Sequence, residues 1–261
     1  MSSMGPHLTK IDCQFYRRSD ASLETCSYVA LNPRAKPGSL VVVGASAARG
    51  NIGGQVACRL ALEHFVDGVF QYCAETAPLN GASTHESNGD LSDPSVAMLE
   101  TGFKNANSSV YNFGHKLAAG GRMAASLLAL VIESDSVAAG KVGDGSAYLF
   151  RDGTLFPFFD NSIMTEEPAH GFVGSNSLVS VELASVPASA QDIILFFSSN
   201  LTKDKSGQLK AALTELSQET YLNCQQISAR LLTIAEPSVF FMTARIGPEA
   251  VYLRNALEVG F

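Results

Sequence analysis

Between residues 122 and 200, short apolar runs follow one another with the texture of strands. The runs are "MAASLLALVIES", "SVAAGKVG", "SAYLFRDGTLFPFF", "SLVSVELAS" and "DIILFFSS". "RDG" (Arg151 to Gly153) predicts a hairpin turn between two of the apolar runs. This hairpin and the strand at "DIILFFSS" are expected in opposing or adjacent sheets of one sandwich. A chain with this central region does not fit an alternating βαβ array.

Helical patterns flank these strands. Residues 54–70 carry apolar residues at helical spacing. A second helix is expected over 95–113, with Asp93 as its N-cap and Pro94 at its first position. A third helix is expected within residues 206–235. Further strands are expected as a pair around a polar turn in 11–31, at "SLVVVGAS" and at "VFFMTARI". No repeat or linker divides the chain, so residues 1–261 are expected to form a single domain with helices covering both faces of an antiparallel sandwich.

Charge and cysteine content exclude several classes of protein. The formal net charge is −7, and the longest basic cluster is "RR" at Arg17 and Arg18. Nucleic acid and anionic membranes need a concentrated basic surface, so neither is expected as the main partner. The five cysteines include no CxxC pair, which indicates reduced thiols and neither a zinc site nor a disulfide framework. The N-terminus lacks the apolar run of a signal peptide, and we expect a cytoplasmic protein.

The stretch "VVVGASAARGNIGGQVACRLALEHF" is a buried strand, a glycine-rich turn and a helix. One interpretation is a dinucleotide site, in which the helix N-terminus faces a pyrophosphate, as in an NAD(P)-dependent reductase with Asp67 near the ribose. That fold would then continue with alternating strands and helices, whereas residues 122–200 do not. No tyrosine is followed by the Tyr-x-x-x-Lys pair of short-chain dehydrogenases.

A second interpretation depends on several segments in order. The glycine turn resembles the V-V-A-D-G-M-G-G-H segment of type-2C metal-dependent Ser/Thr protein phosphatases. "AAGKVGDGSAYLFRDGTLFPFFDNS" resembles their A-N-V-G-D-S-R-A-Y-L-x-R-D-G-x-L block. "AQDIILFFSSNLTKD" resembles G-D-x-L-L-L-C-S-D-G-L-T-D, and "PSVFFMTARI" resembles the closing D-D-x-T-V-x-V-x-R-I. The resemblance runs from about residue 20 to residue 246. It implies an α+β fold, a four-layer α-β-β-α sandwich of two mainly antiparallel sheets flanked by helix pairs.

The resemblance also implies which residues should hold metal. In that family two divalent cations activate a water, and carboxylates hold the cations. Here the corresponding positions lack carboxylates. The family's metal-binding aspartates correspond here to Thr25, Gly44, Ser199 and Ser238. Its carbonyl-donating glycine corresponds to Ala45, and the histidine of its glycine turn corresponds to Arg49. With four carboxylates lost, a normal binuclear centre is not expected, and the turn is expected to hold no catalytic metal.

Several charged residues remain as candidates for a residual site. Asp144 matches the aspartate that the family links to a third metal, although Asp-Gly also favours a turn regardless of function. Glu24, Asp204 and Glu236 lie close in sequence to the lost positions and would have to rebuild an unusual site. Asp160 is either a turn residue or a cap. Arg17, Arg18 and Arg49 form either an anion pocket or a solvated basic surface.

These observations predict a phosphatase-like pseudoenzyme that binds a protein partner and hydrolyses no phosphoester. Its partner surface is expected on the rim of the old cleft, formed by residues 44–53, 76–94 and 160–177. No cofactor is expected. The alternative is a divergent phosphatase with relocated ligands for manganese or magnesium, and the second alternative is the dinucleotide-dependent reductase.

Overall fold

The computed structural model describes residues 10–17, 26–33, 39–76, 93–117, 123–133, 135–159, 171–218, 223–236, 238, 240–247 and 252–254. The helices are α1 (Ile52–Glu75), α2 (Pro94–Lys116), α3 (Lys203–Leu216) and α4 (Cys224–Ala235). The strands are β1 (Lys10–Arg17), β2 (Cys26–Leu31), β3 (Leu40–Ala47), β4 (Ala125–Ile132), β5 (Ser136–Val142), β6 (Ser146–Arg151), β7 (Thr154–Pro157), β8 (Glu182–Pro187), β9 (Ile193–Phe197), β10 (Phe240–Gly247) and β11 (Tyr252–Arg254).

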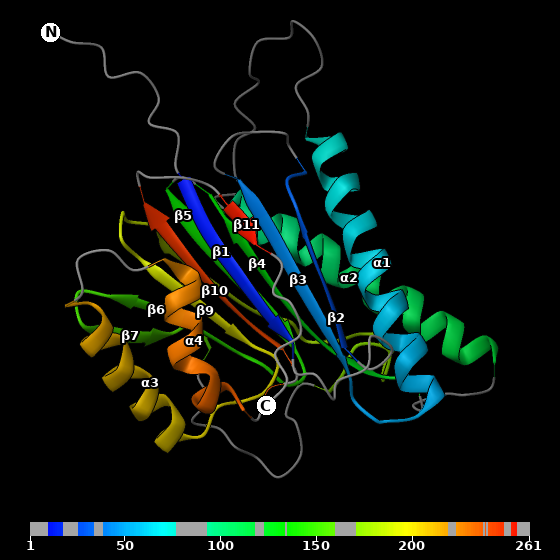
Figure 1. Ribbon diagram of the computed structural model, residues 1–261. Helices are drawn as coiled ribbons and strands as arrows, with labels where there is room; N and C mark the ends of the chain where they lie inside the picture. The colour runs from blue at the N-terminus through cyan, green and yellow to red at the C-terminus, as the bar shows by residue number, and fades with distance from the viewer. Residues whose placement is uncertain are drawn as a thin grey trace, which may run out of the picture.

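The described strands form two sheets that face each other. One has the order β11-β1-β10-β9-β6-β7, and the other has the order β2-β3-β4-β5-β8. Every pairing within them is antiparallel except that of β1 with β11. Helices α1 and α2 cover the outer face of the second sheet, and α3 and α4 cover the outer face of the first (Figure 1). The four-layer α-β-β-α sandwich is therefore confirmed.

Buried side chains form three clusters that match the spaces between these four layers. One cluster joins α1 and α2 to the second sheet and includes Phe65 and Phe103. A second lies between the two sheets and includes Phe15 and Phe196. A third joins α3 and α4 to the first sheet and includes Phe197. Because β4 has a side chain buried at every position, both faces of this sheet are covered.

Local sequence signals set several boundaries. Asp93 caps α2 by accepting a hydrogen bond from the backbone of Ser95, with Pro94 in the first turn. The predicted hairpin turn between β6 and β7 is confirmed, with both Asp152 and Gly153 at positive φ.

Four expectations about the elements need correction. The helix expected within 206–235 is two helices, α3 and α4. The two strands of 11–31 lie in opposite sheets, because β1 pairs with β10 whereas β2 pairs with β3. The strand expected at 177–185 is β8, which begins at Glu182. The hairpin of β6 and β7 shares one sheet with β9, and does not lie in an opposing or adjacent sheet.

The dinucleotide interpretation is wrong. It needs the glycine turn at the carboxyl edge of a parallel sheet. Here β3, which leads into the turn, pairs antiparallel with both β2 and β4.

Candidate functional site

The glycine turn begins in β3, whose side chains alternate between two cores. Val41, Val43 and Ala45 belong to the cluster beneath α1, whereas Val42 belongs to the cluster between the sheets. By this alternation Gly44 faces the space between the sheets. It pairs with Tyr28 on one side and Leu128 on the other.

An aromatic ring fills the space in front of Gly44. A Cβ added to Gly44 would lie 2.2 Å from Cζ of Phe240 and 3.2 Å from Cε1 of Phe196. The first distance is far below van der Waals contact, so no side chain fits unless the Phe240 ring moves. The position that the resemblance assigns to the bridging aspartate therefore has no room for a carboxylate.

Phe240 belongs to a group of four rings, Phe15, Tyr28, Phe196 and Phe240, which we call the aromatic cluster. Phe15 and Tyr28 stack with centroids 4.5 Å apart, and Phe240 lies 6.2 Å from Tyr28 and 5.8 Å from Phe196. Three of the four rings are at most 2% exposed. An apolar environment of this kind does not accept a divalent cation without anionic ligands.

Two serines stand where the resemblance places further metal-binding aspartates, and they bond to each other. The Oγ atoms of Ser199 and Ser238 lie 2.8 Å apart. Ser199 follows β9 and is half-buried, whereas Ser238 precedes β10 and is 4% exposed. Next to them, Oγ of Ser198 accepts a hydrogen bond from the backbone N–H of Phe240 at 3.1 Å. The hydroxyl groups of Ser199 and Ser238 thus connect the ends of two neighbouring strands, at positions where the resemblance places carboxylates.

Asp144 is exposed and belongs to a tight turn between β5 and β6. Both neighbours, Gly143 and Gly145, have positive φ. Asn200 binds this turn twice: its Nδ2 donates to Oδ1 of Asp144 at 3.0 Å, and its Oδ1 accepts from the backbone N–H of Gly145 at 3.1 Å. The backbone N–H of Asp144 donates to Oγ of Ser126 at 3.0 Å. These contacts give Asp144 a role in shaping the turn.

A buried lysine lies beside this turn. Lys141 is 5% exposed, and its Nζ lies 3.4 Å from Oε1 of Glu182 and 5.1 Å from the centroid of the Phe159 ring. Its Nζ also donates to the backbone carbonyl of Gly145 at 3.5 Å. The carboxylate of Glu182 is thus already paired with an ammonium group.

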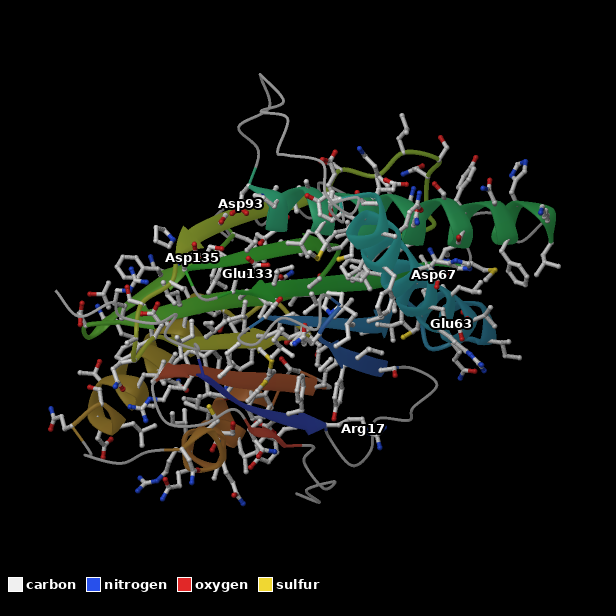
Figure 2. All side chains as sticks on the ribbon, turned by 90° about the horizontal axis from the view of Figure 1, so that it is seen from above. Arg17, Glu63, Asp67, Asp93, Glu133 and Asp135 are labelled. Carbon is white, nitrogen blue, oxygen red and sulfur yellow. The ribbon has the colours of Figure 1, made fainter. Side chains whose placement is uncertain are left out.

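The remaining candidates are scattered. Arg49 is exposed in the bend before α1. Arg17 ends β1 opposite Phe240 (Figure 2). Asp204 lies in the first turn of α3, and Glu236 follows α4. Several candidates lie outside the described residues, namely Arg18, Glu24, Thr25 and Asp160. Most of the expected rim (77–92 and 160–170) lies outside them as well.

Among the described residues, the side chains at these positions do not supply the anionic ligands of a binuclear metal centre. Across the part of the chain that the structure describes, no group of three His, Cys, Asp or Glu side chains could hold a metal ion. The same part contains no helix long and apolar enough to cross a membrane.

Sequence reasoning missed the aromatic cluster, the Asn200 contacts and Lys141. Lys141 had a signal, because it replaces the asparagine of the resembled A-N-V-G-D pattern. The aromatic cluster had none, because its members come from four strands in two sheets.

A family model described as Protein phosphatase 2C matches residues 39–196, more than half of the chain. The chain belongs to the protein phosphatase 2C family. Among curated protein sequences, none matches significantly.

Solved structures of type-2C phosphatases share the fold. The Mycobacterium tuberculosis serine/threonine phosphatase PstP/Ppp is 19% identical, with 92% of this chain and 99% of that chain covered and a TM-score of 0.56. Stp1 from Staphylococcus aureus is 16% identical, with 94% and 99% covered and a TM-score of 0.63. The catalytic domain of PstP in complex with two manganese ions is 18% identical, with 92% and 98% covered and a TM-score of 0.56. Identities this low show a common fold and nothing about activity.

Proposed function

We propose that this type-2C protein is a pseudophosphatase, which binds a protein partner and does not hydrolyse phosphoesters. The observation that carries the proposal is the contact between Gly44 and Phe240. A Cβ at Gly44 would lie 2.2 Å from the Phe240 ring, so the space for a bridging carboxylate is already occupied. The absence of a carboxylate at position 44 therefore involves the packing of the Phe240 ring as well as the identity of the residue at that position.

Neighbouring groups support the same proposal. The hydroxyls of Ser199 and Ser238 satisfy each other at 2.8 Å, and Asp144 is held by Asn200. Hard divalent cations prefer several anionic oxygens. Lys141 beside the same turn is paired with Glu182, so that carboxylate already has a cationic partner. These residues offer no set of ligands that would offset the charge of two dications.

The direct test measures metal binding and hydrolysis in parallel. Calorimetry with manganese and magnesium should show no binding tighter than millimolar. A p-nitrophenyl phosphate assay should show no activity above buffer, with a type-2C phosphatase that retains all its aspartates as the positive control. Binding of two ions at micromolar concentration, or manganese-dependent hydrolysis, would instead support the divergent phosphatase with relocated ligands.

A second experiment tests the physical reason. The triple variant Gly44→Asp/Ser199→Asp/Ser238→Asp should not bind manganese, because the Phe240 ring still fills the site. Adding Phe240→Ala to that variant should produce measurable manganese binding. Equal manganese affinity with and without Phe240→Ala would show that the ring is not the obstacle.

A further inference from the structure

A groove with a volume of about 740 Å³ lies between strand β2 and helix α1. Ser27 and Val29 of β2 form one side, and Val56, Leu62 and Val66 of α1 form much of the other. It lies on the outer face of its sheet, because α1 covers the face opposite the aromatic cluster. It is therefore distinct from the vestigial metal site.

Strand β2 is the edge of its sheet. In the order β2-β3-β4-β5-β8, the described part of the chain places no strand on its other side. Ser27 of β2 and Cys58 of α1 both line the groove, so this end of β2 lies against the helix. An open sheet edge beside a groove is the arrangement on which an extended peptide adds as a further strand.

The floor of the groove is apolar. Leu62 is 5% exposed and Cys58 is 1% exposed, whereas Val29, Val56 and Val66 are half-buried. Burial raises the pKa of the Cys58 thiol to about 12, which is the effect of an environment that disfavours charge. The floor thus accepts apolar side chains and not charged ones.

The rim of the groove is acidic. Glu63 and Asp67 are one turn apart on α1, and their side chains are 53% and 69% exposed (Figure 2). Glu63 contacts Arg59 at 2.9 Å, whereas Asp67 contacts His64 at 3.3 Å. His64 is charged only when protonated, so two carboxylates face one permanent cation. The net charge of −7 over the whole chain acts in the same direction and favours a cationic partner.

We propose that this groove binds an extended, basic segment of a partner protein, which pairs with β2 as an additional strand. Alternate apolar side chains of the segment rest over Val29 and Val66, and a Lys or Arg contacts Glu63 and Asp67. A small apolar ligand would use the floor but leave the strand edge and the acidic rim unused. The proposal rests on the partner-binding half of the proposed function and places that binding on β2 and α1.

The test selects peptides on the purified full chain from a display library of random octapeptides. Enriched sequences should alternate apolar and polar residues and contain at least one Lys or Arg. Synthetic copies should bind about tenfold more weakly to the double variant Glu63→Lys/Asp67→Lys. The matched control is Glu100→Lys, a charge reversal at an exposed i,i+4 pair on α2, which should leave affinity within about twofold.

A second measurement keeps the proposal testable if the double variant is unstable. Proline placed at alternate positions of the best peptide removes the backbone donors and should abolish binding to the unchanged protein. Amide exchange at β2 should slow when the original peptide binds. The absence of enriched peptides, selection without basic residues, or equal loss of affinity in Glu100→Lys would overturn the proposal.

The outcome is separable from that of the pseudophosphatase proposal. If the chain binds peptides and also hydrolyses phosphoesters, the proposed peptide-binding groove is supported and the proposal of a pseudophosphatase is rejected. If the chain hydrolyses no phosphoester and selects no peptides, only the proposal of a peptide-binding groove is rejected.

Discussion

At the scale of single residues, specific packing surrounds the positions where the family motifs have aspartates. Gly44 is required by the close approach of Phe240, since its own backbone is not at positive φ. Ser199 and Ser238 are not simply truncated ligands, because each hydroxyl satisfies the other. At these three positions neutral groups contact one another, and the following two predictions test what these contacts contribute to stability.

Gly44→Ala should destabilise the protein by about 1–3 kcal/mol, because the added methyl group overlaps the Phe240 ring. Chemical denaturation measures the effect. Gly50→Ala is the matched control, since a Cβ at Gly50 meets nothing within 4 Å. Combining Gly44→Ala with Phe240→Leu should recover part of the loss; a loss unchanged by the second substitution would contradict the clash.

Ser199→Ala and Ser238→Ala should each destabilise the protein by about 1 kcal/mol, because each leaves one hydroxyl without its partner. The double variant should cost less than the sum of the two, since no orphaned hydroxyl remains. Urea denaturation of all four proteins gives the coupling energy. Strict additivity would mean that the two hydroxyls do not depend on each other.

At the scale of elements, one ion pair joins three strands of the two sheets. Arg151 at the end of β6 makes two hydrogen bonds to Asp192, of 2.8 Å to Oδ1 and 2.6 Å to Oδ2, just before β9. The same guanidinium donates to the backbone carbonyl of Pro187 at the end of β8, 2.7 Å away. Asp192 is 1% exposed. The "RDG" signal thus marks a connection between sheets as well as a hairpin.

Asp192→Ala should destabilise the protein by about 1–3 kcal/mol, because it removes a buried carboxylate that accepts two hydrogen bonds from Arg151. Thermal and urea denaturation measure the change. Glu63→Ala is the comparison, since Glu63 pairs with Arg59 on the exposed face of α1 and should contribute less than about 0.5 kcal/mol. Similar effects from the two substitutions would contradict the importance of burial at Asp192.

At the scale of the whole molecule, three separate cores hold four layers together. The aromatic cluster lies in the space between the two sheets, in front of Gly44. The family fold therefore persists without carboxylates at these positions. The stability of the molecule then depends on core packing, and on the few buried groups that titrate.

Cys58 should make stability fall at alkaline pH. Its pKa is raised by burial from 9.0 to about 12 in the folded protein, so above pH 9 the unfolded chain loses this proton while the folded chain keeps it. Ionisation of the thiol stabilises the unfolded state, so the free energy of unfolding falls by up to about 1.4 kcal/mol per pH unit. The difference in free energy of unfolding between the unchanged protein and Cys58→Ala should be constant over pH 6–8 and change by about 1.4 kcal/mol, to the disadvantage of the unchanged protein, by pH 10. A difference that stays constant to pH 10 would show that Cys58 does not titrate as its burial implies.

The sequence by itself determined the layers of this protein and showed which residues stand at the positions of the family's aspartates. Apolar periodicity, the Asp93 cap and the "RDG" turn are local, and local patterns are visible in one segment at a time. The replacement of aspartates by Gly44, Ser199 and Ser238 was likewise visible against the family motifs.

Only the tertiary structure decided what took their place. The Phe240 ring in front of Gly44, the bond between Ser199 and Ser238, and the groove between β2 and α1 each join residues far apart in the chain. The partition of β1 and β2 between opposite sheets is of the same kind. Such contacts depend on which strands pair and which faces pack. Those choices are made by the complementarity of whole surfaces, which no single segment of sequence contains.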